Sequence, residues 1–242
     1  MSNTILYLVL FLAPLIGGLI AVFYKKEKST NFPVLMGFVG AFLLSIVLVG
    51  ILPHLYHEED TSIAIFILIG FFIESILELI FGTKHDHHGH DHEHNHAHAS
   101  LPIGLFIALA IHSFAEGIPL THRINGSADA QTGLIFGIAL HEMIAAFSLL
   151  ILVRTTGLKK GAIIGLAILY AIISPSGAIL GSFYDGAHDH AHAMPKLMAV
   201  AVGTILHVSM DVLSQPLHSK SKQLVKFVAI ILGIAAGFLL IH

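Results

Sequence analysis

The chain has 242 residues, of which 55% are hydrophobic and only 11% are charged, with a formal net charge of −3 and no cysteine. Soluble domains carry about 25% charged residues, so this composition excludes a soluble globular protein and indicates a polytopic membrane protein. The absence of cysteine excludes disulfides, thiolate ligands and a cysteine nucleophile. The sequence also has no signature of nucleic-acid binding.

A helix that crosses a bilayer needs about 20 apolar residues. Segments of about this length occur at 5–24, 33–53, 61–82, 101–121, 130–153, 160–183, 195–215 and 223–242. We therefore predict an all-α integral membrane protein with eight transmembrane helices, forming one transmembrane domain over residues 1–242. The first segment lacks a basic region before it, so we interpret it as a retained helix and not a cleaved signal peptide.

Basic residues predict the orientation of these helices. Of the 12 Lys and Arg residues, ten fall in or beside the odd-numbered connections, and only Arg123 and Lys196 fall on the other side. Cytoplasmic connections of membrane proteins are enriched in Lys and Arg. We therefore expect the odd connections to be cytoplasmic and both termini to be extracellular.

Two connections are rich in histidine. Residues 84–99 form a predicted cytoplasmic loop without the apolar content that a folded segment needs, so we expect it to be disordered. Residues 185–194 form a predicted extracellular loop. Imidazole-rich tracts of this kind are typical of metal binding, and the candidate ligands are His85, His87, His88, His90, His92, His94, His96, His98, His188, His190 and His192. The alternative for the longer loop is a solvated linker or a tag, although its interleaved Asp and Glu argue against a tag.

Two predicted helices carry ionisable residues at their centres. His112 and Glu116 are four residues apart, so they share one face of a helix, and His141 and Glu142 occupy the middle of the next helix. An ionisable side chain at mid-membrane costs about 2.5–3.5 kcal/mol on insertion scales. Imidazole and carboxylate together suit a divalent transition metal. We predict an intramembrane metal site at His112, Glu116 and His141; the alternative is a buried structural His–Glu pair.

Other polar residues have weaker interpretations. Pro53 should kink or end the second helix, which would place His54 and His57 at the outer surface, where they either collect cations or are simply solvated. Glu74 and Glu78 are four apart near the cytoplasmic end of the third helix. They either line an exit or lie at the interface, and we favour the interface.

The sixth and seventh helices also contain polar interruptions. Ser174 and Pro175 at mid-membrane indicate a break that lines a cavity. His207 and Asp211 share a helix face and are candidates for binding the metal along a polar pathway. Ser113, beside the main site, is a further candidate.

The motif on the fourth predicted helix and the helix arrangement resemble those of a known family. The sequence His-Ser-Phe-Ala-Glu-Gly over 112–117, eight helices and a His-rich loop between the third and fourth helices are similar to the ZIP family of zinc/iron-regulated metal transporters. The fifth helix of that family often carries His-Glu-x-Pro-(His/Glu), and residues 141–145 here read His-Glu-Met-Ile-Ala. The Leu-Pro-His sequence at 52–54 also resembles the turn at the end of the family's second helix.

The resemblance implies roles for the site residues. His112, Glu116 and His141 match the family's main transport site, while Ser113, Glu142 and Glu116 match positions used by a second metal. Two departures count against that second metal, because Ala145 and Ser174 stand where binuclear members have a ligand. We therefore expect a single metal, with its coordination completed by water, by Glu142 or by His207.

The function implied by the resemblance is import of a divalent metal, zinc in the first place, across the plasma membrane. Nitrogen and oxygen ligands also admit Fe²⁺, Mn²⁺, Cd²⁺, Ni²⁺ and Co²⁺. ZIP relatives resemble elevator carriers with a 3+2+3 inverted repeat, in which helices 1, 4, 5 and 6 move against helices 2, 3, 7 and 8. The expected partners are metal ions and the lipid bilayer, without nucleic acid, and a homodimer is compatible with the sequence.

Two other functions remain open. His141-Glu142 begins like the zinc-protease motif His-Glu-x-x-His, although Ala145 stands in place of the second His, so an intramembrane zinc-dependent hydrolase is one alternative to a transporter without enzyme activity. A metal sensor that does not transport is the other. Zinc-dependent hydrolysis in detergent would identify the first, and an absence of metal flux would identify the second.

Overall fold

A computed structural model describes residues 2–24, 32–58, 62–81, 102–122, 128–185, 193–217 and 219–241. Within these ranges the chain is helical and contains no strand. The elements are α1 (Asn3–Phe23), α2 (Phe32–Ser45), η1 (Ile46–Ile51), α3 (Leu52–Glu58), α4 (Ile63–Phe81), α5 (Ile103–Gly117), η2 (Ile118–Thr121), α6 (Ala128–Arg154), α7 (Lys160–Ala171), α8 (Ile173–Asp185), α9 (Ala193–Ser214) and α10 (Lys220–Ile241).

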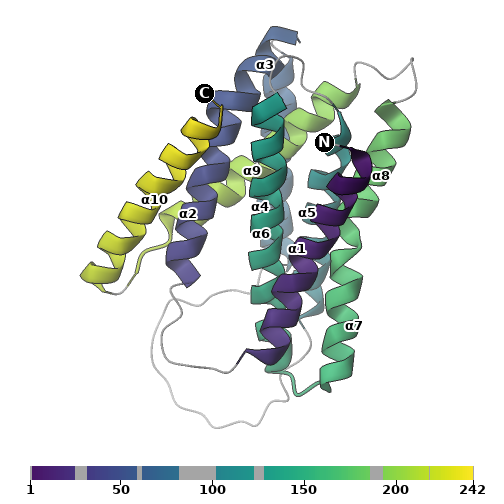
Figure 1. Cartoon of the computed structure of the whole chain (residues 1–242), viewed down its shortest axis with the longest axis vertical. Coiled ribbons are helices and arrows are strands. Elements are labelled where there is room, and N and C mark those ends of the chain that lie inside the picture. The colour runs from purple at the N-terminus through teal and green to yellow at the C-terminus, as the bar shows by residue number, and fades with distance from the viewer. Residues whose placement is uncertain are drawn as a thin grey trace.

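These elements build eight helices that are long and apolar enough to cross a membrane, over 3–23, 33–56, 63–81, 103–121, 130–154, 160–183, 193–214 and 220–241. The prediction of an all-α protein with eight spanning segments is therefore confirmed. The helices run side by side as a bundle, and both chain ends lie at the same end of it (Figure 1). The chain is a multi-pass membrane protein.

The second span is longer than predicted. Pro53 does not end it, because the helix continues through the π-helical turn η1 and through α3 as far as Glu58. The N–H of Leu52 donates to the carbonyl of Val47, five residues back. Proline is tolerated in the first turn of a helix, and a π-helical adjustment satisfies the backbone groups that proline leaves free in membrane helices.

The sixth span is interrupted as the sequence predicts. α7 ends at Ala171 and α8 begins at Ile173, so Ser174 and Pro175 lie in the first turn of α8. Pro175 has no N–H for the preceding turn, which accounts for the position of the break. The interruption places a polar side chain and irregular backbone at membrane depth, inside the bundle.

Close helix packing depends on glycine. At the crossing of α4 and α9, a Cβ added to Gly70 would meet the carbonyl oxygen of Val200, and one added to Gly203 would meet that of Ile67. Small residues at such contacts let membrane helices approach until backbone touches backbone. The most extensive helix contacts are α2 with α10, α1 with α6, α4 with α9 and α5 with α8.

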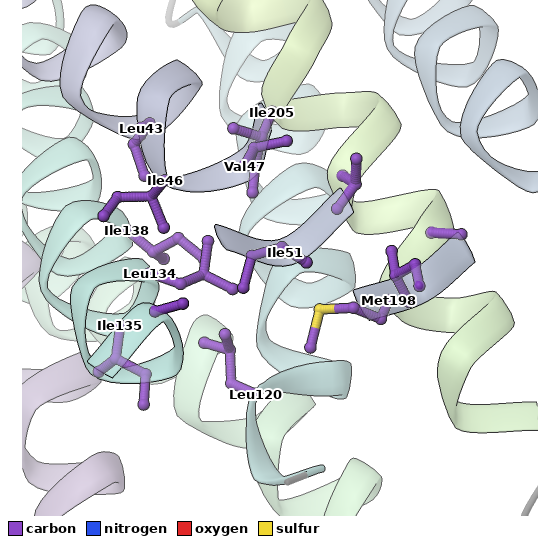
Figure 2. Close-up of a cluster of buried hydrophobic side chains, with 14 of the residues drawn as sticks. Leu43, Ile46, Val47, Ile51, Leu120, Leu134, Ile135, Ile138, Met198 and Ile205 are labelled. Atoms are coloured by element: carbon purple, nitrogen blue, oxygen red, sulfur yellow. The ribbon is translucent and has the colours of Figure 1, made fainter. Parts of the chain in front are cut away.

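An apolar cluster joins several helices inside the bundle (Figure 2). It brings together residues of α2, η1, η2, α6 and α9, including Leu43, Ile46, Val47, Ile51, Leu120, Leu134, Ile135, Ile138, Met198 and Ile205. Because lipid is as apolar as these side chains, their contribution comes from tight packing and not from exclusion of water. The cluster fixes α6 just before His141, three residues beyond Ile138.

Candidate metal site

Three ligand-bearing side chains meet between α5 and α6. One ligand atom each from His112, Glu116 and His141 lie within 4.8 Å of one another, which makes these residues the one group of three such side chains found in the described ranges. The exposed fractions are 2% for His112, 1% for Glu116 and 7% for His141. The three residues predicted from the sequence are therefore adjacent and buried.

Their polar atoms converge without satisfying one another. Nε2 of His112 lies 3.2 Å from Oε1 of Glu116, yet this nitrogen and Glu116 Oε2 have no hydrogen-bond partner among the described residues. The His141 ring lies edge-to-face against the His112 ring, with 5.7 Å between their centroids. Buried polar atoms are nearly always hydrogen-bonded, and an ion is one accepted reason for an exception. This chemistry fits a divalent metal.

The site borders a small cavity. Glu116 and His141 line it from one side, and Met36 and Gly40 of α2 and Ser209 of α9 line it from the other. Its volume is about 10 Å³, which is close to the space that a single water needs. A single ion or water molecule therefore fits beside Glu116 and His141.

Close packing of α5 against α8 positions the helix that carries His112 and Glu116. A Cβ on Gly117 would meet the carbonyl of Ser174, and one on Gly177 would meet the carbonyl of Phe114. The reciprocal contact brings the first turn of α8 against the end of α5, directly after Glu116. Ser174 is buried, and its Oγ has no hydrogen-bond partner in the described part of the chain.

Glu142 has a different environment from His141. Its Oε2 accepts a hydrogen bond from the Tyr170 hydroxyl at 3.0 Å, while Oε1 has no partner among the described residues. Ser113 Oγ lies 2.9 Å from the same hydroxyl. Ser113 and Glu142 are thus buried beside the three-residue group and joined by Tyr170, a partner that the sequence does not single out.

The prediction that Glu74 lies at the interface is wrong. Its Oε2 lies 3.0 Å from Nδ1 of His112, and its side chain is 14% exposed. Glu78, one turn later, is 61% exposed and its Oε2 lies 3.8 Å from His207 Nε2. The spacing of the two glutamates and the nearby Lys84 were compatible with an interfacial pair, and no local pattern distinguished them.

The remaining predicted pathway residues lie outside the three-residue group. The His207 ring packs edge-to-face on Phe71, and Asp211 is exposed and accepts a hydrogen bond from Gln215. His54 lies half-buried on α3. The His57 side chain and the loop histidines at 85–98 and 188–192 fall outside the residues whose placement is described.

The fold and the site define a multi-pass helical membrane protein with a buried cluster of two histidines and a glutamate, side chains of the types that bind metals. The sequence model of the ZIP zinc transporter family matches residues 82–241, which is more than half of the chain. The chain therefore belongs to the ZIP family, and the resemblance seen in the sequence is confirmed.

Named relatives agree with this assignment. The chain is 30% identical over 139 residues to the protein zntD of Dictyostelium discoideum, a match that covers 55% of this chain and 20% of that protein. It is 29% identical over 169 residues to zinc transporter ZIP3 of Bos taurus, covering 67% of this chain and 53% of the relative. It is 25% identical over 162 residues to human zinc transporter ZIP1, covering 64% and 49%. The chain thus matches between a fifth and about half of the length of these relatives.

Proposed function

We propose that this chain transports a divalent transition metal, zinc in the first place, through a site formed by His112, Glu116 and His141. The observation that carries the proposal is the convergence of three buried ligand atoms within 4.8 Å inside a bundle of apolar helices. Ionisable residues at this depth mark ion pathways. The names of the zinc transporter relatives support zinc, and the family match favours transport over the hydrolase alternative.

The ligand set suits an ion that must be released. Three protein ligands leave an open coordination position, whereas four protein ligands make a closed structural site. Glu142, whose Oε1 is unpaired among the described residues, is our proposed candidate for that open position when water does not fill it. The same set of nitrogen and oxygen ligands accepts Fe²⁺, Mn²⁺, Cd²⁺, Ni²⁺ and Co²⁺. Competition among these ions in an uptake assay measures the selectivity.

We propose an inverted repeat of three, two and three helices. In such a repeat, spans 1, 2 and 3 correspond to spans 6, 7 and 8, and span 4 corresponds to span 5. The contact between α2 and α10, in spans 2 and 8, then corresponds to the contact between α9 and α4, in spans 7 and 3. The contact between α1 and α6 likewise corresponds to the contact between α8 and α5. These four contacts are the most extensive in the bundle, which supports the proposed symmetry.

We further propose alternating access by an elevator movement. The extensive contacts of α1 with α6 and α7, and of α5 with α8, join spans 1, 4, 5 and 6 into one body. The contacts of α2 with α9 and α10, and of α4 with α9, join spans 2, 3, 7 and 8 into another. The cavity beside Glu116 and His141 lies where the two bodies face each other, since its other wall comes from α2 and α9.

The proposed direction is import across the plasma membrane, with both termini outside. Two basic residues support the assignment of one bundle end to the cytoplasm. Arg154 donates to the carbonyls of Ala21 and Tyr24 at the end of α1, and Lys226 donates to the carbonyls of Val212 and Gln215 at the end of α9. A homodimer is a compatible assembly, and the whole residue range 1–242 is proposed to act as one transport domain.

Zinc uptake by proteoliposomes tests this function. The purified chain should carry zinc into vesicles, His112→Ala should abolish the flux, and Ser75→Ala should leave it unchanged. Ser75 is a matched control because it lies in the same bundle and, among the described residues, its hydroxyl bonds within its own helix, to the carbonyl of Phe71. An inactive wild-type chain, or full flux in His112→Ala, would contradict the proposal.

A further inference from the structure

We propose that Glu74 is a positioning residue that holds His112 in the orientation and tautomer required of a metal ligand. The inference rests on the proposed function, because it assigns a role toward the metal that His112 binds. Glu74 comes from α4, a helix that supplies none of the three converging ligands. Its role would therefore be exerted through His112.

The hydrogen-bond chemistry fixes the tautomer. Oε2 of Glu74 lies 3.0 Å from Nδ1 of His112, and a carboxylate can only accept. The hydrogen of a neutral His112 ring is then on Nδ1, which leaves the Nε2 lone pair free on the side of Glu116. Metal-ligating histidines commonly donate their second N–H to a carboxylate, which orients the ring and raises its basicity as a ligand.

The neighbours of Glu74 on α4 make its position specific. Ser75 bonds to its own helix, and Glu78 is mostly exposed and faces His207. Glu74 alone among the three directs its side chain to the site. A carboxylate within a spanning helix costs free energy unless it has a polar partner. The hydrogen bond to His112 supplies that partner for Glu74.

The hydrogen bond crosses the boundary between two closely packed pairs of helices. α4 packs against α9 through Gly70 and Gly203, and α5 packs against α8 through Gly117 and Gly177. The direct contact between α4 and α5 is much smaller than either of these. The orientation of His112 therefore depends on the alignment of the two pairs, and a movement that parts α4 from α5 would withdraw the acceptor and weaken the metal site.

Titration with Co²⁺ in detergent tests the inference at equilibrium, independently of flux. We expect Glu74→Leu to weaken the His112-dependent affinity by about 10–100-fold, as loss of such a partner generally does. Glu74→Gln should weaken it several-fold, because its amide oxygen still accepts the hydrogen bond but without the charge. Ser75→Ala should bind as the wild type does. The Co²⁺ absorption bands should keep their positions in all variants, since the metal's own ligands are unchanged.

Each other outcome overturns the inference in a recognisable way. Unaltered affinity in Glu74→Gln and Glu74→Leu would show that the contact is only structural, with the proposed metal site intact. Shifted Co²⁺ bands in a Glu74 variant would make Glu74 a direct ligand. Absence of His112-dependent Co²⁺ binding in the wild-type chain would remove the proposed function as well. Should Glu74→Leu fail to fold, the nearly isosteric Glu74→Gln decides the question.

Discussion

The hydroxyl of Tyr170 donates a hydrogen bond to Glu142 at 3.0 Å, inside the bundle between α6 and α7. The same hydroxyl lies 2.9 Å from Ser113 Oγ. Ser113 and Glu142 are two of the positions that the family resemblance connects with a second metal, and here a tyrosine joins them. Together with Ala145 and Ser174, this arrangement supports the proposal of a single metal, because Tyr170 engages one oxygen of Glu142 and the Ser113 hydroxyl, and two carboxylate or imidazole ligands of the family pattern are missing.

Restoring a ligand at residue 145 should tighten the site. Ala145 is buried one helical turn after His141, and its side chain is 8% exposed. We expect Ala145→Glu to bind zinc more tightly and to release it more slowly, because an additional protein carboxylate takes the coordination position otherwise left to water or to Glu142. The equilibrium affinity and the rate of metal release would be measured beside Ala145→Gln, which adds the same volume without the charge. Equal affinities in the two variants would contradict the prediction.

Lys226 should contribute to stability and not to metal affinity. Its side chain is 1% exposed, and Nζ donates to the carbonyls of Val212 at 2.8 Å and Gln215 at 2.6 Å. A hydrogen bond to a charged group contributes about 1.5–3 kcal/mol, so Lys226→Met should lower the free energy of unfolding in detergent by about that amount. Lys222→Met, at an exposed position of the same helix, is the control. A loss no larger than that of the control would refute this role.

The sequence predicts the spans well because hydropathy is a local property, and the His112–Glu116 pair follows from helical spacing alone. Contacts between distant segments are what local patterns miss. Glu74 and Glu78 have similar sequence surroundings. Only the position of α4 beside α5 gives Glu74 a contact with His112 that Glu78 lacks. The charge pattern assigns Lys226 to a connection, yet its stem lies against Gly37 of α2 and its ammonium group donates to a carbonyl of α9.

The orientation of the bundle can be tested at the His-rich loop. The distribution of Lys and Arg predicts that residues 84–98 lie in the cytoplasm. A reporter inserted in this loop should be inaccessible from outside an intact cell, whereas one placed after residue 242 should be accessible. Labelling of the loop from outside would reverse both the orientation and the proposed direction of import.

The His-rich loop should regulate transport without being required for it. Deleting residues 85–98 removes eight histidines but none of the three converging ligands. We expect zinc flux in proteoliposomes to persist, with an altered response to metal on the cytoplasmic side. Complete loss of flux in a correctly inserted deletion variant would instead make the loop an obligatory relay.

The most direct test of the central claim is to locate the bound metal by anomalous scattering from crystals of the zinc-loaded chain. The proposal predicts one fully occupied ion between α5 and α6, coordinated by His112, Glu116 and His141. A second dication within a few ångströms would be strongly repelled in a buried site where Ala145 and Ser174 replace the ligands that it would need. Two fully occupied ions between these helices, or no ion near His112, would contradict the proposal.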